Sequence, residues 1–274
     1  MKLISAHDGQ LVEMNASAWT DSARPAPFTT GLPALDAILP PGGVARGAVH
    51  EMLYADRQPE PVFVAMVLAK RASKTLMTKP ETRIKSEARN PNDSSFTISS
   101  FGFDSEFGLR HSDFSRAIIW SDPHRTLYPP ALFAAGVNPC DLWLLHPRSE
   151  QEELWAVAEC LRCRGVAATV AQLPAKLHRN DARRLQLAAE RGGGVGIIMR
   201  PFSRGAEVYA AATRWLIEPA RGERTIQRWK ITLLHGHGGQ IGKSIILERC
   251  RENHLVRAVD ELVDRPGIAE IAIA

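Results

Sequence analysis

Two stretches of the sequence contain residue types that could bind phosphate. A phosphate-binding loop needs glycines whose backbone N–H groups close around the anion, then a Lys for the phosphates and a Ser or Thr for the metal ion. The run Gly236-x₅-Gly242-Lys243-Ser244 has these types, but five residues separate the glycines where the motif has four. Because a strand pattern follows and little chain remains for further βαβ units, the run predicts a glycine-rich hairpin turn.

The second stretch lies where an α/β fold would bind phosphate, between its first strand and the helix that begins at Val62. It consists of Tyr54, Ala55, Asp56, Arg57, Gln58, Pro59, Glu60 and Pro61. It contains no glycine, and two prolines remove N–H donors from the start of the helix. Asp56 and Glu60 place negative charge where a phosphate would sit. The sequence therefore predicts a degenerate site, no nucleotide cofactor and no ATPase activity.

Other catalytic or metal-binding patterns are incomplete. The cysteines are Cys140, Cys160, Cys163 and Cys250. Cys160 and Cys163 form a C-x-x-C pair, but no second pair or H-x₃₋₅-H follows, so we expect no metal site. His235 and His237 stand beside glycines and are typical of a solvated turn. No serine has the context of a nucleophile elbow. We therefore expect a protein without catalytic residues.

The overall composition indicates a soluble globular protein with a mild positive charge. The 274 residues are 45% hydrophobic and 23% charged, with a net charge of +4 and a pI near 9.0. The longest apolar runs are about half of the roughly 20 residues that span a bilayer, and the N-terminus lacks a signal-peptide pattern, so we expect a cytoplasmic protein. The charge would suit single-stranded DNA as a partner. The basic residues that could contact it are Arg179, Arg183, Arg184, Arg221, Arg224, Arg228, Lys230 and Lys243.

Short apolar strands alternate with helical patterns through the middle of the chain. Expected strands are 48–54, 117–120, 141–145, 166–173, 195–199, 214–217, 228–234 and 244–248, and expected helices are 31–39, 62–71, 130–135, 149–161, 181–190 and 255–263. Uninterrupted apolar strands at this spacing predict an α/β fold with a mostly parallel sheet flanked by helices. The last strands have no long helix between them, which predicts a C-terminal antiparallel hairpin.

The same pattern divides the chain into three parts. Residues 1–27 are expected to be a loose or weakly helical lead-in, 28–248 the core, and 249–274 a C-terminal helix and apolar tail. Within the core, the polar stretch 72–113 is expected to be a poorly ordered insert. The C-terminal part is predicted to dock on a partner or on its own sheet, because its apolar residues need cover. These residues are Leu255, Val259, Leu262, Val263, Ile268, Ile271 and Ile273.

The opening of the core resembles the approach to the ATP site in RecA. The resemblance lies in Gly31-Leu-Pro-Ala-Leu-Asp36 and in Pro41-Gly-Gly-Val-Ala-Arg-Gly-Ala-Val-His-Glu51. It implies a RecA-like core in which the strand ending at Asp122 would carry a catalytic glutamate and the strand ending at Gln172 a metal-linked aspartate. Neither residue is present at those positions. The resemblance therefore implies a RecA-like fold with a degenerate P-loop.

These motifs, together with the hairpin 229–248, are similar to the ImuA family. The resemblance implies an SOS-regulated accessory factor in translesion DNA synthesis and DNA repair. It implies contacts with ImuB, a Y-family polymerase homologue, with RecA, and indirectly with an error-prone replicative-type polymerase. Two alternatives stay open: a working RecA-like ATPase in DNA repair, and a cell-division inhibitor of the SulA type.

Overall fold

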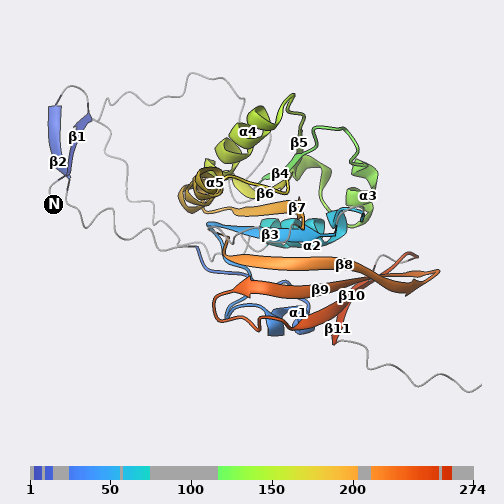
Figure 1. The fold of residues 1–274 in the computed structure, drawn as a ribbon. Helices are drawn as coiled ribbons and strands as arrows, with labels where there is room; N and C mark the ends of the chain where they lie inside the picture. The colour runs from blue at the N-terminus through green and yellow to red at the C-terminus, as the bar shows by residue number, and fades with distance from the viewer. Residues whose placement is uncertain are drawn as a thin grey trace, which may run out of the picture.

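The structure, a computed structural model, describes residues 3–7, 10–14, 25–55, 58–74, 117–202, 211–252 and 255–260. Its centre is a nine-stranded sheet with the order β11-β10-β9-β8-β3-β7-β6-β4-β5. The parallel strands are β3 (Ala48–Tyr54), β4 (Ala117–Ser121), β5 (Leu142–Leu145), β6 (Val166–Gln172) and β7 (Val195–Pro201). The expected α/β fold with a mostly parallel sheet is confirmed (Figure 1).

The sheet changes direction at β8, which runs parallel to β3 on one side and antiparallel to β9 on the other. The strands of this C-terminal part are β8 (Thr213–Glu223), β9 (Ile226–Gly236), β10 (Ser244–Cys250) and β11 (Val256–Asp260). The expected antiparallel hairpin is therefore confirmed and is extended by one further strand. The glycine-rich run around Gly242 forms the β9–β10 turn, as the sequence predicts.

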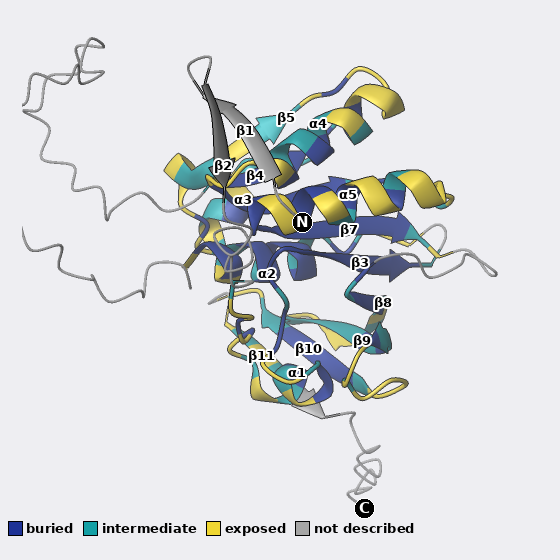
Figure 2. Ribbon diagram, turned by 90° about the vertical axis from the view of Figure 1, so that its left-hand side faces the viewer, coloured by how far each residue is buried: buried dark blue, intermediate teal, exposed yellow. Residues whose placement is uncertain are grey.

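Helices cover both faces of the sheet. They are α1 (Pro33–Ile38), α2 (Val62–Lys74), α3 (Pro129–Ala134), α4 (Glu150–Arg162) and α5 (Arg179–Gly192), with a short 3₁₀ helix at Pro139–Asp141. A large apolar core joins α1, α2 and α3 to one face, and a smaller core joins α4 and α5 to the other. In Figure 2 the central strands β3 and β7 are buried along almost their whole length. None of the helices in the described ranges is long and apolar enough to cross a lipid bilayer.

Local sequence explains where the helices begin. The Oγ of Ser149 accepts a hydrogen bond from the Glu152 backbone N–H at 3.2 Å, and the Glu152 carboxylate accepts one from the Arg148 N–H at 2.8 Å. Such side-chain partners satisfy N–H groups that the first turn of α4 would otherwise leave unpaired. Proline stands in the first turn of α1 and α3, where its missing N–H removes no helical hydrogen bond.

The N-terminal lead-in differs from its expectation. Residues Leu3–His7 and Gln10–Met14 form the antiparallel strands β1 and β2, with His7 opposite Gln10, instead of loose or weakly helical chain. The sequence contains a signal for this hairpin, because the intervening pair Asp8-Gly9 is typical of a two-residue β-turn. The stretches of strand-forming residues on each side are short, and the surrounding Ser, Ala and Pro residues are more typical of irregular chain.

The C-terminal part also differs, because the expected helix 255–263 is wrong over β11. Leu255 and Val259 have helical spacing, but the residues between them also alternate. Val256 and Ala258 pack against the main core, whereas Arg257 lies on the opposite side and is mostly exposed. Pairing with β10 satisfies the backbone hydrogen-bonding groups of this segment, and the strand conformation places Val256 and Ala258 on the core side of the sheet.

The first three residues of the expected insert 72–113 are helical. Residues 72–74 belong to the last turn of α2, and Ala72 is fully buried. The remainder of the expected insert lies outside the described residues.

Candidate functional site

The carboxyl ends of β3, β7, β6 and β4 lie at one edge of the parallel sheet, where open α/β folds bind their ligands. Three neighbouring cavities follow this edge. The arginine cavity, about 480 Å³, is lined by Phe63, Trp229, Arg249 and Arg251 among others. The central cavity, about 430 Å³, contains Asp122 and Gln172, and the Glu153 cavity, also about 430 Å³, contains Glu153 and Ser149. Glu60 lines the first two and His124 the last two, so the cavities adjoin.

The predicted degenerate phosphate position borders the first two of these cavities. Pro59 and Glu60 line both, and the N–H of Val62 at the start of α2 donates to the Glu60 carbonyl at 2.8 Å. Pro59 and Pro61 have no N–H to offer. The described part of this turn therefore has few backbone donors for an anion, while Asp56 and Arg57 lie outside the described residues.

Asp122 stands at the end of β4, where the RecA resemblance expects a glutamate. Its carboxylate accepts hydrogen bonds from the backbone N–H groups of Thr126 at 2.9 Å and Leu127 at 3.1 Å. Asp122 is only 6% exposed. Its two carboxylate oxygens thus fix the loop that follows β4.

The end of the neighbouring strand β6 also makes contacts within the protein. The Gln172 side-chain N–H donates to the Tyr54 hydroxyl at 2.9 Å, and this bond links the ends of β6 and β3. On the other face of the sheet, the Ser121 hydroxyl donates to a Glu153 carboxylate oxygen at 2.6 Å. Burial raises the pKa of Glu153, although the Ser121 bond opposes this effect.

Glu51 lies in the middle of β3 and binds two arginines from the adjacent strands. Its carboxylate accepts from Arg200 of β7 at 3.0 Å and from Arg214 of β8 at 2.9 Å. All three side chains are 7% exposed or less. Burial lowers the pKa of Arg200, while Glu51 opposes that shift. Two cations and one anion are therefore buried together on the face that α4 and α5 cover.

The residues that carry the family resemblance have structural roles in this part of the chain. The Asp36 carboxylate accepts hydrogen bonds from the backbone N–H and the hydroxyl of Thr30, which fixes the start of α1. Gly43 has φ +94°, and a Cβ there would lie 2.4 Å from the Phe28 carbonyl oxygen. Arg46 lies over the Phe28 ring at 4.7 Å and donates to the Ala72 carbonyl at 2.9 Å. These residues shape the backbone before β3 and hold it against α2.

His50, in the same motif, forms a buried network. Its Nδ1 lies 2.7 Å from the Thr213 hydroxyl, and its Nε2 lies 2.9 Å from the Ala45 carbonyl. The Trp215 indole N–H donates to the same Thr213 oxygen at 2.7 Å. The arrangement fits a neutral imidazole that accepts from Thr213 and donates to Ala45. Burial lowers the pKa of His50 to about 4.

The basic residues that the sequence predicts for DNA contact are distributed over several elements. Arg179, Arg183 and Arg184 lie on α5, Arg221 and Arg224 near the β8–β9 turn, Arg228 and Lys230 on β9, and Lys243 at the β9–β10 turn. Arg228 is bound by Glu248 at 2.7 Å, so its charge is already balanced. DNA contact through this set stays a prediction.

The predicted docking residues lie at the end of the chain and are described only in part. Leu255 is 67% exposed and precedes β11, and Val259 belongs to that strand. The other five, Leu262, Val263, Ile268, Ile271 and Ile273, lie outside the described residues.

The arginine cavity cannot be predicted from the sequence, because its walls come from distant segments. Phe63 of α2 stacks on Trp229 of β9, and Arg249 of β10 lies over the same phenyl ring. No local spacing connects these residues. In the part of the chain that is described, no three His, Cys, Asp or Glu side chains converge closely enough to hold a metal ion.

Comparison with known proteins gives the family of the chain. No family model matches the sequence. Two proteins described as "Protein ImuA", both from Caulobacter vibrioides and belonging to the strains NA1000/CB15N and ATCC 19089/CB 15, are each 31% identical to it over 166 residues. The match covers 54% of this chain and 68% of each relative. At this identity and coverage, and with the motifs before β3 in place, the chain belongs to the ImuA family.

Proposed function

We propose that the chain is a non-catalytic, RecA-like accessory factor of SOS-induced translesion DNA synthesis. It would act by binding an ImuB-type polymerase homologue and RecA, and through them an error-prone replicative-type polymerase. Membership of the ImuA family supports the mutagenesis role. The absence of catalysis is inferred from the carboxyl edge of the parallel sheet.

The observation that carries the non-catalytic part is the engagement of Asp122. A catalytic carboxylate in an ATPase must be free to position water or metal. The Asp122 carboxylate instead accepts two backbone hydrogen bonds within its own loop. The proline-containing turn from Pro59 to Pro61 and the Gln172–Tyr54 bond support the same proposal.

A thermal-shift experiment with Mg-ATP tests this part. A ligand at 100 times its dissociation constant stabilises the protein that it binds by about 2.7 kcal/mol, so even micromolar binding would raise the melting temperature at millimolar ATP. We expect no shift and no phosphate release above a protein-free control. A saturable shift that Glu60→Lys alters would contradict the proposal and favour the ATPase alternative.

Co-purification tests the partner part. The segment 261–274 begins directly after β11 and contains most of the predicted docking residues. A chain that ends at Asp260 keeps every described strand, so we expect it to melt near the wild-type temperature but to retain less ImuB after DNA damage. If its melting temperature falls while ImuB binding persists, the tail belongs to the core and the ImuB contact lies elsewhere.

A further inference from the structure

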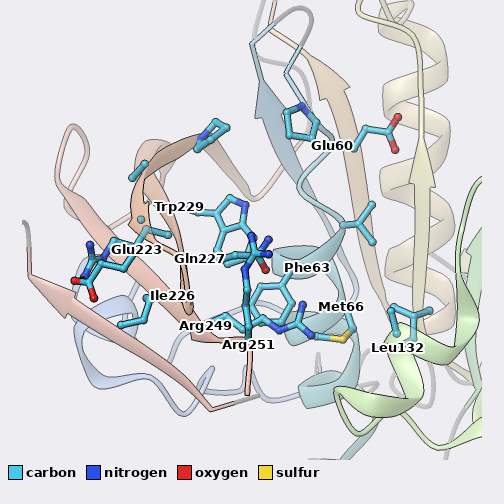
Figure 3. Close-up of a pocket in the computed structure, with 17 residues that line it drawn as sticks. Glu60, Phe63, Met66, Leu132, Glu223, Ile226, Gln227, Trp229, Arg249 and Arg251 are labelled. Carbon is cyan, nitrogen blue, oxygen red and sulfur yellow. The ribbon is translucent and has the colours of Figure 1, made fainter. Parts of the chain in front are cut away.

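The arginine cavity lies between α2 and the ends of β8, β9 and β10 that project beyond the parallel strands. Its middle holds the rings of Phe63 and Trp229, which stack with centroids 4.9 Å apart and planes inclined by 18°. Figure 3 shows this aromatic pair with the side chains of Arg249 and Arg251 beside it. The volume of about 480 Å³ falls in the range of roughly 300–1,000 Å³ found for ligand pockets.

Contacts within the cavity limit what can bind to the aromatic pair. The Arg249 guanidinium carbon lies 4.8 Å from the centroid of the Phe63 ring, and Trp229 stacks on the same ring. The Phe63 ring is therefore already in contact with two side chains of the protein. Apolar side chains of Met66, Leu132 and Ile226 complete the wall. Such a wall suits an aliphatic or aromatic side chain better than a base.

The charges in the cavity are uneven. Arg228 binds Glu248 at 2.7 Å and Glu223 at 3.5 Å, and the hydrogen bond to Glu248 raises its pKa. Arg251 is exposed, and its side chain has no hydrogen bond or ion pair with the described residues. In Figure 3 the Glu60 and Glu223 side chains lie apart from the aromatic pair on opposite sides of the view. The middle of the cavity is therefore apolar, with the exposed Arg251 as a cation beside it and the carboxylates of Glu60 and Glu223 farther away.

We propose that the arginine cavity binds a short acidic segment of a partner protein. One large apolar side chain of the segment would lie against Trp229 and Met66, and an adjacent carboxylate would pair with Arg251. A buried apolar anchor beside a charge of the opposite sign is a common basis of specific recognition between proteins. The proposal rests on the proposed function as a binding factor and gives that factor a defined surface.

A random-peptide phage library panned on the full chain provides the probe. We expect the selected peptides to have Asp or Glu next to Leu, Phe or Trp. The affinity of a labelled selected peptide is then measured for the wild type, Arg251→Glu and Gln227→Glu. Arg251→Glu should weaken binding by about tenfold, because it replaces the attraction for the acidic residue of the peptide with repulsion between like charges.

Arg184→Glu is the matched control, because it makes the same charge change at an exposed position of α5, on the opposite face of the sheet. It should leave the peptide affinity unchanged. Both cavity variants alter side chains that are not fully buried, and circular dichroism and melting temperature will verify that they fold.

Three results would overturn the proposal: no enriched peptide, enriched peptides without acidic residues, or affinities that Arg251→Glu leaves unchanged. A dT₁₅ oligonucleotide is tested as the alternative ligand. If no peptide is enriched, and dT₁₅ binds to the wild type but not to Arg251→Glu, the cavity would be assigned to nucleic acid. ImuB co-purification is scored separately. If ImuB does not co-purify but the peptide still binds, the result would contradict ImuB as the partner and would leave the proposed peptide site of the cavity unaffected.

Discussion

Arg214 Nε donates a hydrogen bond of 2.9 Å to a Glu51 carboxylate oxygen, and both side chains are almost completely withdrawn from solvent. Glu51 also binds Arg200, so one buried carboxylate pairs with two buried guanidinium groups. Glu51→Gln should lower the free energy of unfolding by about 3–5 kcal/mol, because it removes the charged partner that both buried guanidinium groups share. Urea denaturation measures this loss.

Glu159→Gln is the control for that substitution. Glu159 binds Arg162 at 2.6 Å, but both side chains are about two-fifths exposed. An exposed pair of this kind contributes about 0–1 kcal/mol, so the control should denature close to the wild type. Similar losses for both variants would contradict a special role for the buried cluster.

The stability of the protein should fall in mildly acidic solution because of His50. The folded-state pKa of about 4 is below the unfolded value of 6.5, so the unfolded chain binds a proton more readily as the pH falls. The loss begins below pH 6.5 and is complete near pH 4, where a shift of this size corresponds to about 3 kcal/mol. Denaturation curves at several pH values test it.

The His50 imidazole can also be observed directly. Its ring protons should keep the chemical shifts of the neutral form between pH 7.5 and 5.5. His237→Gln changes an exposed residue in the β9–β10 turn and should leave the pH dependence of stability as it is. A normal titration of His50 near pH 6.5 would refute the buried neutral state.

Glu153 should show the opposite pH dependence. Its pKa is raised by burial, so the charged form costs stability once the pH rises above the unfolded value of 4.5. Glu153→Gln keeps an acceptor for Ser121 and removes the charge, so this variant should melt at a higher temperature than the wild type at pH 7.5. The difference should shrink as the pH falls towards 4. Glu252→Gln, at an exposed position, should give no such gain at either pH.

Gly43→Ala should destabilise the protein by more than about 2 kcal/mol, because the new Cβ would lie 2.4 Å from the Phe28 carbonyl oxygen at a φ of +94°. Gly242→Ala separates the cost of the steric contact from the cost of the positive φ angle. Gly242 has φ +82° but no atom within 4 Å of its Cβ position. The Gly242→Ala variant should therefore lose only about 1–2 kcal/mol of its free energy of unfolding, which is the cost of the positive φ angle. Equal melting temperatures for the two variants would show that the contact with Phe28 is relieved cheaply.

Single-stranded DNA binding, if it uses the basic residues that the sequence indicates, should weaken steeply with salt. Each neutralised phosphate contributes a slope of about −0.7 to the dependence of log affinity on log salt for single strands. Lys243→Glu and Arg184→Glu should each reduce that slope without changing the melting temperature, since both residues are exposed. An affinity for dT₁₅ that is independent of salt would exclude this mode of binding.

The parts of the fold that could be predicted are those with a strong local pattern. β6 and β7 are continuous apolar segments because helices cover both of their faces. The sequence of β11 is ambiguous, because Leu255 and Val259 fit a helical period as well as Val256 and Ala258 fit a strand. The β1–β2 hairpin depends on a short turn signal that the surrounding composition outweighs.

Most of the candidate site could not be predicted, because its contacts join distant parts of the chain. Glu51 is 149 residues from Arg200 and 163 from Arg214. The pair Phe63 and Trp229 is equally non-local. The lack of glycine in residues 54–61 and the aspartate in place of glutamate at residue 122 can be read directly from the sequence, because they are local features.

The position of β3 in the sheet bears on how the protein is made. Its parallel neighbours are β7, where Ala48 pairs with Val195, and β8, where His50 pairs with Thr213. On the ribosome, β3 has emerged long before either partner is translated. Its seven buried residues must therefore wait for later parts of the chain, a high contact order that slows folding and leaves an apolar strand available to chaperones. The completion of the fold is thus tied to synthesis of the chain beyond residue 213.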